Sequence, residues 1–81
     1  MPLVTEAEVI STIETALGLE PGSVSEETSM ANTGAWDSLG HLNVLVALDS
    51  RLAGRLAGIK EMATATSVDA ILDLLKRHSL I

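Results

Sequence analysis

The stretch "GAWDSLGHLNVLV", residues 34–46, holds the start of the helix around which we expect the fold to form. From Ser38 the apolar residues recur at helical spacing, and the predicted helix runs to about Ala53, just before Gly54. Its core-facing arc is expected to contain Leu42, Val44, Leu45, Leu48 and Leu52. Four residues are expected on the opposite side, namely Gly40, Asn43, Ser50 and Arg51. Serine is a favoured N-cap, so one interpretation of Ser38 is a cap worth about 1 kcal/mol.

The flanking sequence predicts two more helices of similar length. A capping-box pattern, Thr5 with Glu8, begins the first, and Gly18 ends it. A Thr66/Asp69 pair is expected to begin the last helix, whose predicted core residues are Val68, Ile71, Leu72 and Leu75. Lys76, Arg77 and His78 then fall in its last turn, where positive charge suits the helix dipole.

The segments between these helices complete the predicted fold. Residues 19–37 show no sustained periodicity, and we expect a long loop anchored by Val24, Met30 and Trp36. A short helical segment is expected around Ile59 to Met62. The sequence therefore predicts one all-α domain over residues 1–81, a small bundle of three main helices plus a short third helix.

Composition supports helices and excludes several classes of function. Trp36 is the one aromatic residue, so the core must be aliphatic, which favours helices over strands. The net charge of −6 argues against a nucleic-acid partner, and the absence of cysteine excludes disulfides and thiolate metal sites. His41 and His78 stand too far apart in sequence to suggest zinc, so no metal site is predicted.

Membrane and secretory signals are missing from the sequence. No apolar run approaches the roughly 20 residues that span a bilayer, and the first residues lack a signal-peptide pattern. We therefore expect a cytoplasmic protein without a membrane partner.

Ser38 is the residue with the most chemical interest. With His41 three residues later and Asp37 beside it, it suggests a nucleophile–base pair. So small a domain has little room for a substrate cleft, so we predict no enzyme and no catalytic residue, and we expect His41 to be partly exposed on its helix. A serine hydroxyl at a helix start also suits a phosphate ester, because the positive end of the dipole favours an anion there.

Leu39 and Val46 fall outside the expected core arc. Next to a candidate reactive serine, exposed apolar residues indicate a docking face. Two isolated surface aliphatics, which need no explanation, are the equal alternative at this point.

The stretch "WDSLGHLNVLVALDSRL", residues 36–52, resembles the modification-site helix of acyl carrier proteins, whose signature is Asp-Ser-Leu. The capped first helix, long acidic loop, short third helix and final "TSVDAILDLL" helix follow in the same order as in that family, over essentially the whole chain. The resemblance implies that Ser38 carries 4′-phosphopantetheine, transferred from coenzyme A by a phosphopantetheinyl transferase. The thiol of that group would hold acyl groups as thioesters for acyl-loading and acyl-transferring enzymes of fatty-acid-like, polyketide or specialised lipid biosynthesis.

The resemblance also assigns partner contacts. Asp37 would help to position the transferase and its metal ion, Leu39 and Val46 would contact partners, and Asp49 would remain from an acidic partner-binding face. Acids are depleted on that face, since Gly40, Asn43 and Ser50 are neutral and Arg51 and Arg55 are basic, which favours a specialised, free-standing carrier. We expect the protein to be a monomer. The alternative is an unmodified helical adaptor that binds through Leu39 and Val46, with Ser38 only capping.

Overall fold

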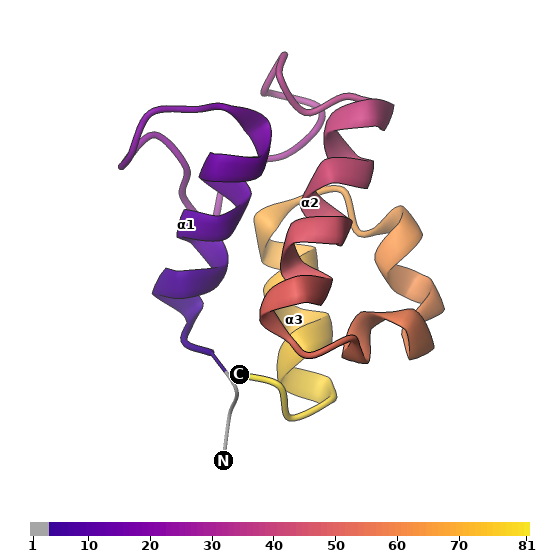
Figure 1. Ribbon diagram of the computed structural model, residues 1–81. Coiled ribbons are helices and arrows are strands. Elements are labelled where there is room, and N and C mark those ends of the chain that lie inside the picture. Colours follow the sequence, from indigo (N-terminus) through magenta and orange to yellow (C-terminus); the bar gives the residue numbers. More distant parts are fainter. Residues whose placement is uncertain (1–3) are drawn as a thin grey trace.

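The structure is a computed structural model that describes residues 4–81 (Figure 1). It contains three α-helices and two short 3₁₀ helices, in the order α1 (Glu6–Leu17), α2 (Ser38–Arg51), η1 (Arg55–Gly58), η2 (Lys60–Thr64) and α3 (Val68–Arg77). The all-α prediction is confirmed. No helix within residues 4–81 is both long and apolar enough to cross a bilayer. The prediction that the first residues do not form a signal peptide rests partly on residues 1–3, which lie outside the described residues.

Helix α1 begins and ends as its sequence predicts. The Glu8 backbone N–H donates to Thr5 Oγ1 and the Thr5 N–H donates to Glu8 Oε1, each at 3.1 Å, which completes the capping box. At the other end Gly18 adopts the left-handed conformation, with φ of 70°.

The loop of residues 19–37 is fastened to the core at several points. Val24 and Trp36 are buried and Met30 is half-buried, so the three predicted anchors are confirmed. A fourth was not predicted: the buried Glu14 carboxylate accepts from the N–H groups of Gly22 (2.9 Å) and Val24 (3.1 Å). Two backbone N–H groups thus satisfy the buried side-chain oxygen and fasten the loop to the end of α1.

Helix α2 is rotated relative to the predicted arc. Leu42, expected in the core, is 56% exposed, whereas Gly40, expected outside, is buried. The reason is geometric: at about 100° per residue, Gly40 lies about 40° from Val44 around the helix and Leu42 about 160° away. The expectation for Gly40 was therefore wrong, and Val44, Leu48 and Leu52 form the core side. The helix also ends earlier than predicted, at Arg51, and Gly54 follows with a φ of 79°.

The chain after α2 differs from the prediction in detail. Instead of one short helix around Ile59, two 3₁₀ helices flank that residue, and Leu56, Ile59 and Met62 are buried. Helix α3 is capped by Ser67, whose Oγ accepts from the Ala70 N–H (3.1 Å), and not by Thr66. Thr66 instead offers its carbonyl to the Met30 N–H (2.8 Å), which ties the long loop to the start of α3.

The helices enclose one aliphatic core. In Figure 1, α1 and the 3₁₀ helices flank α2 on opposite sides, and α3 lies behind it. The four predicted core residues of α3 are buried, and so is Leu74. Trp36, only 1% exposed, brings the end of the long loop into this core immediately before α2.

Candidate functional site

Ser38 is the first residue of α2 and is exposed, but it does not cap the helix. The cap is Asp37, whose Oδ1 accepts from the Gly40 N–H (2.7 Å). Among residues 4–81, no hydrogen bond uses the Ser38 hydroxyl. The interpretation of Ser38 as the N-cap was therefore wrong, because the neighbouring carboxylate already performs that task.

The helix terminus leaves backbone N–H groups near Ser38 without a carbonyl partner. The N–H groups of the first turn have no carbonyl partner within an α-helix, and the Asp37 cap takes only that of Gly40. The first turn of α2 itself contains no acidic residue. A phosphate ester on the Ser38 oxygen would therefore lie beside free N–H groups and the positive end of the dipole.

His41 is not the partly exposed residue that we expected. It is 6% exposed, and its ring stacks on that of Trp36 with centroids 6.0 Å apart. Nδ1 accepts from the Trp36 indole N–H (3.0 Å), which leaves Nε2 to donate to the Met62 carbonyl oxygen (2.8 Å). Both ring nitrogens are thus engaged away from Ser38, and the two residues do not form a nucleophile–base pair.

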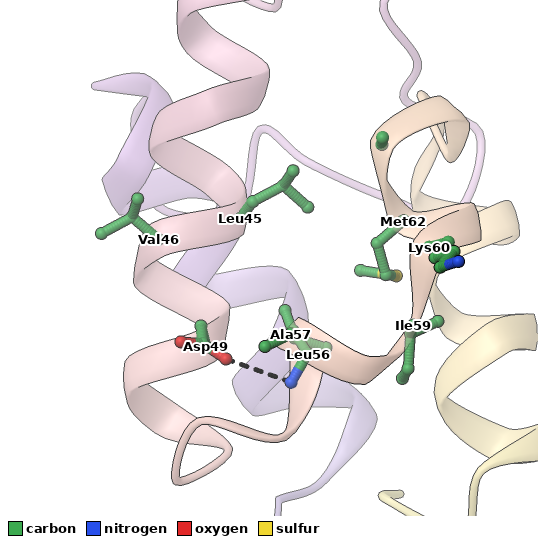
Figure 2. Close-up of a pocket in the computed structure, with 9 residues that line it drawn as sticks. Leu45, Val46, Asp49, Leu56, Ala57, Ile59, Lys60 and Met62 are labelled. Carbon is green, nitrogen blue, oxygen red and sulfur yellow. Dashed lines mark hydrogen bonds between the residues drawn. The ribbon is translucent and has the colours of Figure 1, made fainter.

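Two hollows lie on the side of α2 that faces the 3₁₀ helices. The Ser38 hollow has a volume of about 460 Å³ and is lined by Met30, Ser38, His41, Ala63, Thr64 and Thr66. The apolar groove has a volume of about 330 Å³ and is lined by Leu45, Val46, Asp49, Leu56, Ala57, Ile59, Lys60, Met62 and Ala63. Figure 2 shows Leu45 reaching from α2 toward Met62 across this groove. The two hollows adjoin, because Ala63 lines both.

Three large apolar side chains project from α2 into solvent. Leu39 is 68% exposed and Val46 63%, as the sequence predicts, and Leu42 belongs with them. Leu42 lies three residues after Leu39 and four before Val46, so the three form one line on the helix, here called the α2 stripe. The same spacing could have predicted that Leu42 is exposed, so its expected place in the core was wrong.

Two charged side chains of α2 are engaged within the molecule. Asp49 Oδ1 accepts from the Leu56 N–H (3.0 Å), which fixes the start of η1 to α2 (Figure 2). Arg51 forms an ion pair with Glu8 of α1. The partner roles of Asp37 and Asp49 stay predictions, but each carboxylate has a structural role that the sequence did not indicate.

The described residues offer no metal centre near Ser38 or elsewhere. Within residues 4–81, no three His, Cys, Asp or Glu side chains stand together as metal ligands could. The chain has no significant match among protein-family models, curated proteins or solved structures.

Proposed function

We propose that this protein is an acyl carrier, with 4′-phosphopantetheine attached to Ser38. The observation that carries the proposal is that Asp37 caps α2 and leaves the exposed Ser38 hydroxyl without a hydrogen bond. The Asp-Ser-Leu sequence at this helix start, with its resemblance to acyl carrier proteins, supplies the identity of the modification.

The attachment step uses the Ser38 oxygen as nucleophile. It attacks the phosphorus of the phosphopantetheine part of coenzyme A, and a phosphodiester forms as 3′,5′-adenosine diphosphate leaves. The proton of the hydroxyl passes to a base of the transferase, since His41 is committed to Trp36 and Met62. The chain itself supplies an accessible hydroxyl and a helix terminus that favours the anionic product. When attached, the group supplies the thiol that this cysteine-free chain lacks.

The adjoining hollows support a carrier role. The Ser38 hollow lies where the attached arm begins, and the apolar groove continues from it past Ala63. Its volume of about 330 Å³ is near the lower limit of small-molecule sites, about 300 Å³. An acyl chain of modest length would contact the apolar side chains that line it.

The α2 stripe supports docking of partner enzymes. Exposed apolar side chains in one line beside the modified serine form a contact surface that is complementary to an apolar patch. Helix α2 contains a single acidic residue, Asp49, and its exposed Asn43 and Ser50 are uncharged, so this face has a weak negative field. We therefore favour partners from a specialised pathway over those of housekeeping fatty-acid synthesis.

An unmodified adaptor remains the second candidate because the α2 stripe alone would serve it. That alternative gives Ser38 no task except capping, which Asp37 performs. The two candidates differ in the chemistry of loading. After treatment with a phosphopantetheinyl transferase and an acyl-coenzyme A, a carrier should retain an acyl group that neutral hydroxylamine releases, as a thioester requires. An adaptor should retain none, and neither should Ser38→Ala.

A further inference from the structure

His41 joins three segments that surround Ser38. The residue lies on α2 three positions after Ser38. Its Nδ1 accepts a hydrogen bond from Trp36, which lies two positions before Ser38. Its Nε2 binds the Met62 carbonyl in η2, 21 residues farther along the chain. The turn that presents Ser38 is thus connected through one imidazole ring to the 3₁₀ helix that faces it.

A polar ring at a buried position is costly unless its nitrogens are satisfied, and an aliphatic residue would fill the same space without that requirement. The two bonds of His41 depend on each other. Because the Trp36 indole can only donate, Nδ1 must be the acceptor, and this fixes the tautomer in which Nε2 carries the proton. The Trp36 bond therefore prepares the ring to donate to Met62.

The contact with Met62 connects His41 to the residues that form one wall of the Ser38 hollow. Ala63 and Thr64 directly follow Met62, and together with Ser38 and His41 they line the Ser38 hollow. If η2 moved away from α2, this wall would move with it, although the Ser38 hydroxyl would keep its place on α2.

We infer that His41 is a positioning residue for the modification of Ser38: it holds η2 against the Ser38 turn, so that the serine and η2 form one surface for the transferase. This inference rests on the proposed function and adds a role for a residue that does not touch the reacting atoms. Loss of the Met62 bond should therefore weaken recognition of the apo-protein and leave the chemical step unchanged.

Two substitutions separate the two bonds. The amide nitrogen of His41→Gln reaches about as far as Nε2 and can donate to Met62, whereas the oxygen of His41→Asn stands near Nδ1 and can accept only from Trp36. We would measure KM and kcat of a phosphopantetheinyl transferase for each apo-protein at saturating coenzyme A. His41→Asn should raise KM about fivefold, the effect of one net hydrogen bond on an equilibrium. His41→Gln should stay close to wild type, and kcat should not change in either variant.

Melting temperatures provide the control for a merely structural role. Each variant loses one of the two bonds, so both should be destabilised to a similar degree, and a difference in KM between them cannot come from stability. If His41→Asn does not fold, His41→Met, which fills the space without a donor, replaces it with the same expected KM. Equal KM values for wild type, the Gln variant and the variant without a donor would overturn this inference alone. Failure of the wild-type chain to accept phosphopantetheine would overturn the proposed function, and this inference with it.

Discussion

At the start of α2, the helix cap and the free hydroxyl belong to two neighbouring residues, Asp37 and Ser38. The Asp37 carboxylate accepts from the Gly40 N–H at 2.7 Å and caps the helix, while the Ser38 side chain stays exposed and unbonded. Helix capping and the proposed modification therefore depend on neighbouring but different side chains, and substitutions can separate them.

The first prediction concerns this separation. Asp37→Ala should lower the free energy of unfolding by about 1 kcal/mol, the usual effect of losing an N-cap. Ser38→Ala should change it by less than about 0.5 kcal/mol, as expected of a surface substitution. Urea unfolding of the two variants beside wild type measures both values. A loss in Ser38→Ala as large as that in Asp37→Ala would show that the serine caps after all.

Gly40 allows α2 to approach the loop before it and the end of α1. A Cβ added there would stand 2.6 Å from the Ala35 carbonyl oxygen and 3.0 Å from Leu17 Cδ2. Gly40→Ala should therefore destabilise the protein, even though alanine is favoured over glycine within a helix by about 1 kcal/mol. Gly58→Ala is the matched control, since nothing lies within 4 Å of its added Cβ. Thermal unfolding should show a lower melting temperature for Gly40→Ala only, and an unchanged or raised value would contradict the close approach.

The α2 stripe should dominate the binding of partner enzymes. Val46→Asp places a charge in the stripe, and we expect it to weaken binding to a cognate acyl-transferring enzyme by at least about tenfold, as loss of a central apolar contact does. Ser11→Asp adds the same charge at an exposed position of α1, away from the stripe, and should have a small effect. Ser50→Asp, four residues after Val46, adds a charge at the end of the stripe itself. Because few free charges take part, binding of the wild type should depend only weakly on salt. Titration calorimetry at two salt concentrations measures both effects. Tighter binding by Ser50→Asp with a steep salt dependence would indicate an electrostatic interface instead.

Acid should weaken the contact between the start of α1 and the end of α2. The Thr5 N–H donates to the Glu8 carboxylate, and Arg51 lies beside it, so the pKa of this carboxyl is held below its usual range. A carboxyl whose pKa is lowered in the folded state stabilises the protein at pH values above its pKa in the unfolded chain. That contribution is lost as the pH falls through the lowered pKa of the folded state. The melting temperature of wild type should exceed that of Glu8→Gln at neutral pH, and the difference should vanish in acid. Glu26→Gln, at an exposed loop position, controls for the change of net charge. A difference that persists unchanged into acid would exclude this linkage.

The sequence was sufficient for features that depend on local patterns. The capping box of Thr5 and Glu8 and the left-handed Gly18 follow from short-range chemistry, and the core residues of α3 follow from helical spacing. The exposure of Leu39 and Val46 was predicted in the same way.

Features that depend on long-range contacts were not predictable. His41 is predicted to be partly exposed on its helix, whereas its buried position depends on a partner, Met62, that is 21 residues away in the sequence. Gly40 lacks a side chain that would reveal a close contact with Ala35 and Leu17. The choice of Asp37 over Ser38 as N-cap is a one-residue difference between two favoured capping residues, and only the backbone geometry decides it.

The intact mass of the protein after exposure to a phosphopantetheinyl transferase and coenzyme A tests the central claim most directly. Wild type should gain the mass of one phosphopantetheinyl group, and fragmentation should place it on Ser38. Ser38→Ala, folded and with nearly the same melting temperature, should gain nothing. Wild-type protein that stays unmodified beside a transferase active on another carrier, or a Ser38→Ala variant that still gains the group, would contradict the assignment of Ser38.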